Sequence, residues 1–217
     1  MSIRKLLAVA AAAACLGGAA SAATVINGGF EDVSGLAKEG LNRGSYGIYN
    51  SVSGWTKGTG GGIELQNNAT LAKRDAHGGN WYVELDSNRN SSMYQDITFA
   101  NAGIYALSFY YAPRTTTPGD NGISYSLTNG SSQLLSGLAD GVAPSDWALV
   151  DAGRFEVDAG STLRLTFAAE GISNGLGGFL DDVSIAPVPL PGSALLLLGA
   201  LSGMGVASRR RKSRSAA

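Results

Sequence analysis

The sequence predicts an all-β protein whose main domain is an antiparallel β-sandwich of the jelly-roll type, and three observations lead to this prediction. Apolar and polar residues alternate in several short runs, which is the period of a β-strand. Clusters of Gly, Asn, Asp and Pro separate these runs, and Gly contributes 31 of the 217 residues. No segment of useful length between residues 24 and 187 has the period of a helix. About eight short strands at close spacing favour two packed sheets.

The expected strands follow one another between residues 81 and 185. In the clearest of them, every second residue from Tyr105 to Tyr111 is large and apolar, so the strand has one buried and one solvated face. The complete set of expected strands is Trp81–Asp86, Met93–Phe99, Ile104–Tyr111, Ile123–Thr128, Gln133–Leu138, Trp147–Val157, Leu163–Phe167 and Gly178–Ile185. Residues 35–79 are rich in Gly, Asn and Ser, so we expect surface loops there with one or two short strands.

The first 22 residues have the pattern of a secretory signal peptide. Arg4 and Lys5 precede the apolar run Leu6–Leu16, and the small residues Ala20-Ser21-Ala22 suit cleavage by signal peptidase. A lipoprotein signal is the less favoured alternative, because Ala stands three positions before Cys15 where Leu is usual. We therefore expect a signal peptide over residues 1–22 and an exported domain over residues 24–187.

The end of the chain has the pattern of a membrane anchor. Leu190–Ala207 contains no charge over eighteen residues, which as a helix spans about 27 Å and just suffices for the hydrocarbon core of a bilayer. A basic end follows, formed by Arg209, Arg210, Arg211 and Lys212. Because cationic residues stay on the cytoplasmic side, we expect a single transmembrane helix over residues 190–207 that places the domain outside.

The exported domain is acidic once the two ends are set aside. It holds nine basic and seventeen acidic residues, a net charge of −8, whereas the whole chain has −1. This balance disfavours a nucleic-acid partner. The single cysteine, Cys15, lies in the signal peptide, so neither a disulfide framework nor a thiolate metal site is expected in the domain.

A short proline motif, Val188-Pro189-Leu190-Pro191-Gly192, connects the domain to the expected helix. Its prolines favour an extended backbone, which is the form that a protease binds. Together with the apolar helix and the basic end, over residues 188–212, the motif resembles the PEP-CTERM sorting signals of Gram-negative bacteria, in their VPLPA variant. The sequence departs from that variant at Gly192, where Ala is usual.

The resemblance to these sorting signals implies a partner and a destination. The partner is an exosortase, a multispanning membrane cysteine protease that cuts near the motif. The protein would be held briefly in the inner membrane of a Gram-negative bacterium and would then reach the cell surface or the extracellular matrix.

Five short segments occur in order along the exported domain. They are Asn27-Gly28-Gly29-Phe30-Glu31, Gly54-Trp55, residues 79–86, Tyr94-Gln95-Asp96-Ile97 and Phe179-Leu180-Asp181-Asp182-Val183. This set resembles the galactose-binding-like jelly roll, the fold of carbohydrate-binding modules and of DUF642-type cell-wall proteins. The resemblance implies a core position for Trp55. It also implies a structural calcium ion that joins the first strand to the last through Glu31 and Asp181, with Asp182 as the alternative.

The alternation of the last strand gives a separate reason to consider Asp181. This residue has the same parity as Phe179, Val183 and Ile185, and a carboxylate on the core face needs a cation or hydrogen-bond donors. Calcium takes about six to eight oxygen ligands, which carboxylates and loop carbonyls provide. The alternative is that Asp181 caps a turn and that Glu31 is solvated.

We expect the exported domain to bind glycans or neighbouring matrix polymers and not to be an enzyme. An aromatic ring stacks on the apolar face of a sugar, and Tyr46, Tyr49 and Tyr110 are the aromatic residues expected at the surface. His77, the only histidine, lies in an expected loop without a nucleophile or zinc motif around it.

Two alternatives to a glycan-binding module remain open. The domain is a polysaccharide-active enzyme that uses two of the carboxylates Glu64, Glu84 and Asp86, or it is a structural surface protein without a ligand.

Overall fold

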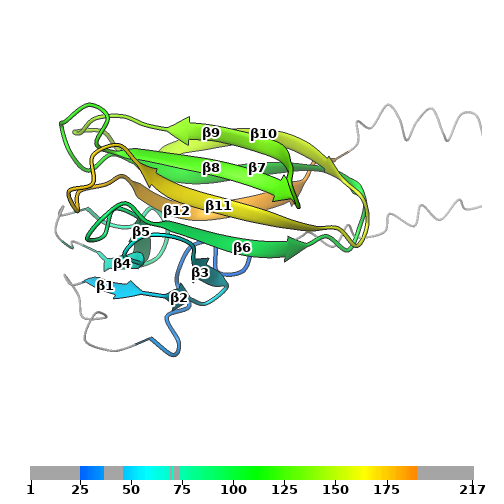
Figure 1. Cartoon of the computed structure of the whole chain (residues 1–217), viewed down its shortest axis with the longest axis horizontal. Coiled ribbons are helices and arrows are strands. Elements are labelled where there is room, and N and C mark those ends of the chain that lie inside the picture. The colour runs from blue at the N-terminus through cyan, green and yellow to red at the C-terminus, as the bar shows by residue number, and fades with distance from the viewer. Residues whose placement is uncertain (1–24, 37–45, 69, 71–73, 190–217) are drawn as a thin grey trace, which may run out of the picture.

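The computed structural model describes residues 25–36, 46–68, 70 and 74–189, which form a two-layer β-sandwich (Figure 1). These residues contain twelve β-strands and no helix, which confirms the predicted all-β fold class. All eight strands expected between residues 81 and 185 are present, and their ends differ from the expected ones by a few residues.

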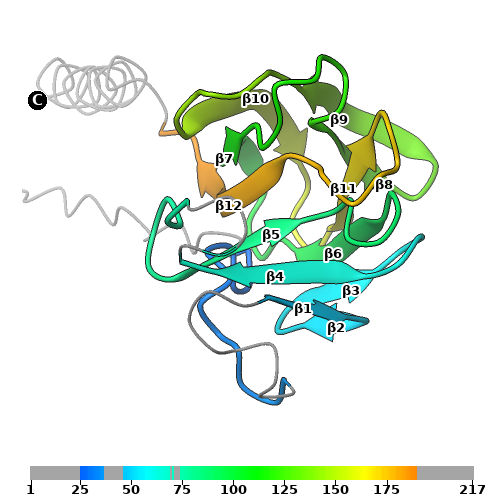
Figure 2. The same ribbon diagram turned by 90° about the vertical axis from the view of Figure 1, so that its left-hand side faces the viewer.

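Each layer is an antiparallel sheet of six strands. Sheet A has the order β1 (Tyr46–Tyr49), β4 (Ile63–Asn67), β5 (Trp81–Glu84), β12 (Phe179–Pro187), β7 (Gly103–Ala112) and β10 (Ala148–Val157). Sheet B has the order β2 (Ser51–Val52), β3 (Trp55–Lys57), β6 (Ser92–Thr98), β11 (Thr162–Glu170), β8 (Gly122–Asn129) and β9 (Ser132–Ala139). The last strand, β12, pairs with β5 and β7 and so lies in the middle of sheet A (Figure 2).

The core between the sheets is built from the alternating apolar residues that the sequence pattern identifies. Every second residue of β7 from Tyr105 to Tyr111 is buried, as expected. Trp55 is also buried, and its ring lies between those of Phe30 and Phe167, at centroid distances of 5.8 and 5.9 Å. The core position that the resemblance implied for Trp55 is therefore confirmed.

The segment of residues 35–79 contains more strands than expected. Four short strands, β1 to β4, lie there, where the sequence predicted one or two. Each has only two to five residues, which is too short for a clear alternation to appear in the sequence. They are held in place by pairing with β5 and β6 and by core residues such as Val52, Ile63 and Leu65.

The expected parity of the last strand is wrong over its first half, because β12 contains an irregularity. The register shifts between Asp181 and Ser184, and Asp182 has a φ of 46°. Before the shift Leu180 points into the core, so Asp181 points away from it. After the shift Val183 and Ile185 point into the core.

The two ends of the chain lie outside the described residues, apart from the start of the proline motif. Val188 donates its N–H to the carbonyl of Ile104 at 2.8 Å, and Pro189 is exposed. The signal peptide, Leu190, Pro191 and Gly192, the expected helix and the basic end are not described. None of the described segments is a helix of the length and apolarity needed to cross a bilayer.

Candidate functional site

The outer face of sheet A is the side that points away from the core, and two rows of paired residues cross it. The first row runs from β1 to β7 through Ile48, Glu64, Glu84, Phe179 and Ala112. The second row begins on the edge strand β1 and runs through Tyr46, Gln66 and Tyr82. Acidic, amide and aromatic side chains are thus brought together on a face that the strand alternation turns away from the core.

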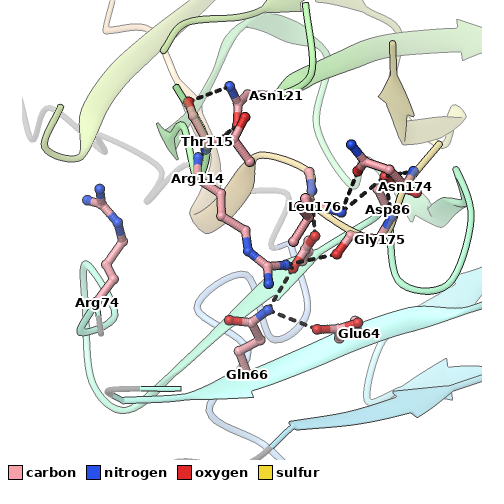
Figure 3. Close-up of polar contacts among 12 residues, drawn as sticks. Glu64, Gln66, Arg74, Asp86, Arg114, Thr115, Asn121, Asn174, Gly175 and Leu176 are labelled. Carbon is pink, nitrogen blue, oxygen red and sulfur yellow. Dashed lines mark hydrogen bonds and ion pairs between the residues drawn. The ribbon is translucent and has the colours of Figure 1, made fainter. Parts of the chain in front are cut away.

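Gln66 connects the two glutamates of this face (Figure 3). Its Nε2 donates to Oε1 of Glu64 at 2.9 Å and to Oε2 of Glu84 at 2.7 Å. The amide is fully buried, and its other atom, Oε1, has no hydrogen-bond partner. An unpaired buried acceptor costs free energy, so this oxygen is a point at which a ligand donor would be stabilised.

Glu84 is the most strongly bonded member of this set. Besides Gln66, it accepts hydrogen bonds from Nη1 of Arg114 at 2.5 Å and from the backbone N–H of Gly177 at 2.5 Å. Burial and then the charge of Glu64 raise the pKa of Glu84, whereas Arg114 and the Gly177 N–H lower it.

Glu64 accepts one hydrogen bond in this set, from Gln66. Burial raises its pKa to about 7, and the Gln66 hydrogen bond and the charge of Arg114 oppose this rise. The two carboxyls therefore share a proton near neutral pH. Burial raises the pKa of Glu84 to about 9 although three donors favour its ionised form, so the proton belongs to the pair and not to one carboxyl alone.

A loop of residues 174–177 is fastened over this face by Asp86. Its Oδ2 accepts the backbone N–H groups of Asn174, Gly175 and Leu176 at 2.9, 2.9 and 3.2 Å. The approach is close, since a Cβ on Gly177 would lie 2.9 Å from the Cβ of Asp86. Asp86 therefore has a structural role, which leaves Glu64 and Glu84 as the paired carboxyls of the face.

The three tyrosines predicted to bind a ligand lie in different environments. Tyr46 is on the outer face of sheet A with 44% of its surface exposed, on an edge strand and not in a loop as expected. Tyr110 is on the same face, but the ring of His77 stacks on it at a centroid distance of 3.3 Å. Tyr49 packs against the core, because its position on β1 has the opposite parity to that of Tyr46.

A second group of aromatic residues covers the part of this face beside β10. Trp147 contacts Tyr82 and Phe179 edge-on or tilted, at centroid distances of 5.8 and 6.5 Å. The guanidinium of Arg74 lies 5.8 Å from the Trp147 ring centroid, and Arg74 also donates to the carbonyl of Ser145 at 2.7 Å. In Figure 3, the Arg114 side chain extends toward Gln66, whereas Arg74 stands to one side and points away.

The carboxylates predicted to bind calcium lie around the loop of residues 77–81. Oε1 of Glu31 accepts the backbone N–H groups of Asn80 and Trp81 at 2.7 and 2.8 Å. Asp181 accepts the N–H groups of His77 and Gly78 at 2.9 and 3.1 Å.

The remaining contacts of Asp181 and Asp182 are with a backbone N–H group and with a ring nitrogen of His77. The N–H of Asp182 donates to Oδ1 of Asp181 at 2.7 Å, and Oδ2 of Asp182 is hydrogen-bonded to Nδ1 of His77 at 2.6 Å. Burial raises the pKa of Asp181 to about 7, with a smaller contribution from the charge of Asp182, against the N–H of Gly78.

This donor set does not fit a calcium shell as it stands. N–H groups repel a cation, and they already bind Oε1 of Glu31 and both carboxylate oxygens of Asp181. Among the described residues, no three His, Cys, Asp or Glu side chains are grouped so as to hold a metal ion. Hydrogen-bond donors therefore meet the need of the buried Asp181, and a calcium ion stays a prediction.

Gln66 and Arg114 were missed by the sequence analysis. The alternation Ile63-Glu64-Leu65-Gln66 does place Glu64 and Gln66 on one face of a strand. No sequence pattern indicated that this strand pairs with β5, because residues 35–79 have the Gly-, Asn- and Ser-rich composition of loops. Arg114 lies in a loop, where alternation gives no information about direction.

No protein-family model matches the chain, and no curated protein matches it. Among solved structures it is similar to a cyclase from Fischerella sp. TAU, with 16% identity and a TM-score of 0.52, over 79% of this chain and 100% of that one. It is also similar to the carbohydrate-binding module TmCBM61 in complex with β-1,4-galactotriose, with 18% identity and a TM-score of 0.48, over 62% of this chain and 88% of that one.

A third similar structure is a family 35 carbohydrate-binding module from Clostridium thermocellum, with 18% identity and a TM-score of 0.36, over 66% of this chain and 92% of that one. At such identities a likeness is informative about architecture alone. The comparison with the cyclase therefore shows that the chain has a β-sandwich fold known from other proteins.

Proposed function

We propose that this protein is exported and that its β-sandwich binds glycans through the outer face of sheet A. The observation that carries the proposal is the pairing of Tyr46 with Gln66 across β1 and β4. Tyr46 presents an exposed ring, and Gln66 keeps an oxygen without a partner. A sugar offers both complementary surfaces, since its C–H face stacks on an aromatic ring and its hydroxyls donate to such an oxygen.

The position of the two residues explains how a sugar reaches them. β1 is a four-residue strand at the edge of sheet A. Among the described residues, no further strand pairs with its free edge. Gln66 is buried as deeply as the two glutamates, so a ligand first contacts the exposed Tyr46 ring and reaches the Gln66 oxygen only after the side chains that cover it rearrange. The cost of burying an unpaired oxygen is relieved in the complex, which favours the bound state.

Sorting to the cell surface or the extracellular matrix is the second part of the proposal. It is supported by the signal-like residues 1–22, by the apolar stretch with its basic end, and by the resemblance of residues 188–212 to PEP-CTERM signals. Strand β12 ends at Pro187, so the sandwich is complete where the proline motif begins. An exosortase would then cut beyond the folded domain.

A glycan array with the purified protein, with and without EDTA, tests the binding function. We expect binding to at least one glycan, a loss of about tenfold or more in Tyr46→Ala, and retention in Tyr46→Phe, which keeps the ring. Leu149→Ala is the matched control, because Leu149 is exposed on the same face at the opposite edge strand. Equal binding by Tyr46→Ala and the wild type would exclude this face as the site.

The cross-strand pair of Glu64 and Glu84 favours a polysaccharide-active enzyme as the second candidate. Two carboxyls of unequal protonation are what an acid–base mechanism needs. Both are almost fully buried, however, so a substrate does not reach them in this conformation. We expect no release of reducing sugar from any glycan that binds, and a release that Glu84→Gln abolishes would support the enzyme instead.

A further inference from the structure

The outer face of sheet B carries a continuous row of hydroxyl side chains. One residue from each strand contributes, and each is paired with the next across the sheet. In spatial order the hydroxyl row consists of Ser51, Thr56, Tyr94, Thr166, Ser126 and Ser136. Because neighbouring strands lie about 4.8 Å apart, the row is about 24 Å long.

The hydroxyl row is accessible and has hollows beside it. Its members are exposed or half-buried, and none is fully buried. At the β8–β9 end lies a shallow hollow of about 470 Å³, whose lining includes the polar residues Ser124, Ser126, Gln133, Ser136 and Thr166 and the apolar residues Tyr125, Leu138 and Ala168. This lining combines hydroxyl and amide groups with apolar surface, to which the 58% exposed Leu138 contributes. Such a combination suits a sugar, which has both hydroxyls and C–H surface.

The face carries few charges although the exported domain has a net charge of −8. The exposed carboxylate of Glu170, at the end of β11, lies on this face and accepts a hydrogen bond from Ser124 at 2.8 Å. Residues 121–139, which contain the whole β8–β9 hairpin, include no charged side chain. Beside the row, Arg164 and Asp96 neutralise each other through two hydrogen bonds of 2.7 Å. Arg164 also lies over the ring of Tyr94, 4.0 Å from its centroid. A polyanion therefore finds no unpaired cation along the row.

The composition of the hydroxyl row also argues against a protein partner. Interfaces between proteins have an apolar, aromatic centre, whereas five of the six residues of the row are Ser or Thr. A row of donors and acceptors spaced one per strand matches an extended, uncharged chain of sugars, in which hydroxyls recur at a comparable spacing.

We propose that the outer face of sheet B is a second glycan surface, which binds an extended neutral polysaccharide laid across the strands along the hydroxyl row. The two sheets pack back to back, so this surface and the Tyr46 face point in opposite directions (Figure 2). If the Tyr46 face binds a glycan as proposed above, a domain with two such surfaces bridges two polysaccharide chains and crosslinks a matrix.

The test is depletion of the purified protein by insoluble particles of β-glucan, β-mannan and β-galactan, with immobilised alginate and heparin as charged comparators. The row variant carries Ser126→Lys and Thr166→Lys. Ser136→Lys is a milder variant that we expect to fold normally, because Ser136 is exposed on the edge strand β9. Ala100→Lys with Ser131→Lys is the matched control, because both positions are exposed and lie outside the row.

We expect depletion by at least one neutral polysaccharide and by neither polyanion. The row variant should bind the particles about tenfold more weakly, whereas the matched control should bind like the wild type. Tyr46→Ala should still bind the particles but should no longer clump them, because clumping needs both surfaces.

The outcomes separate the two proposals. If the row variants bind like the wild type, or if Tyr46→Ala abolishes all binding, the second surface is excluded and the proposed function stands. If the row variants lose all binding while Tyr46→Ala has no effect, the Tyr46 face is excluded and the second surface stands. Depletion by none of the neutral particles overturns the second surface, whereas the Tyr46 face is then judged by the glycan array.

Discussion

Glu64 and Glu84 lie directly opposite each other on the neighbouring strands β4 and β5, with both carboxyls buried on the outer face of sheet A. Like charges at such a distance repel, and the structure resolves the conflict with one amide, one guanidinium and one shared proton. This arrangement determines how the stability of the domain depends on pH.

The first prediction concerns the proton on Glu64. Its pKa rises from 4.5 to about 7 on folding, so the folded chain retains a proton that the unfolded chain releases. The stabilisation is complete below about pH 4.5 and is lost as the pH rises through 7. Glu64→Gln cannot ionise, so we expect it to gain on the order of 3 kcal/mol over the wild type between pH 5 and pH 8.

Urea unfolding of both proteins at pH 5 and pH 8 measures this difference. Glu170→Gln is the control, because Glu170 is exposed. Asp181, whose pKa is also raised to about 7, leaves part of the pH dependence in the variant. If Glu64→Gln and the wild type lose equal stability between the two pH values, Glu64 does not hold the proton.

The second prediction compares a buried ion pair with an exposed one. Arg114 is paired with the fully buried Glu84, whereas Arg164 is paired with Asp96 at the surface. Arg114→Met leaves a buried carboxylate without its cation, and we expect a loss of about 3 kcal/mol at pH 8. The loss should be smaller at pH 5, where burial keeps Glu84 protonated. Arg164→Met should cost about 1 kcal/mol or less. Equal costs for the two variants would contradict the assigned role of Arg114.

The third prediction concerns calcium. Because backbone N–H groups bind the carboxylates of Glu31 and Asp181, we expect the thermal midpoint to be the same in calcium and in EDTA. Asp181→Asn should lower the midpoint equally under both conditions, since it weakens hydrogen bonds and not a metal site. A midpoint that rises with calcium concentration in the wild type and not in Asp181→Asn would show that calcium binds at Asp181.

The fourth prediction concerns sorting. Pro189→Ala combined with Pro191→Ala removes the residues that favour an extended backbone at the motif, so we expect uncut protein to accumulate in the membrane fraction. Immunoblots of the surface, membrane and medium fractions measure this. Cleavage and release at wild-type levels would show that the motif is not the recognition element.

The sandwich was predictable because its long strands alternate clearly, and β7 is the best example. The irregularity at Asp182 was not predictable, since one residue with positive φ reverses the parity of everything after it without a change in composition. It turned Asp181 from an expected core carboxylate into one that loop N–H groups bind.

The candidate site was predictable only in part. Tyr46 was identified as an exposed aromatic residue, but its neighbour Gln66 was not, because their contact depends on pairing between two strands of four and five residues. Tyr49 shows the reverse case. Without knowing that residues 46–49 form a strand, there was no reason to place Tyr46 and Tyr49 on opposite faces.

The central claim, that the Tyr46 face binds a glycan, is tested most directly by nuclear magnetic resonance. The purified ¹⁵N-labelled protein is titrated with a short oligosaccharide taken from a glycan that it binds. We predict that the side-chain amide signals of Gln66 and the backbone amide of Tyr46 shift with the ligand and saturate together. A bound oligosaccharide that leaves both sets of signals unmoved would contradict the claim.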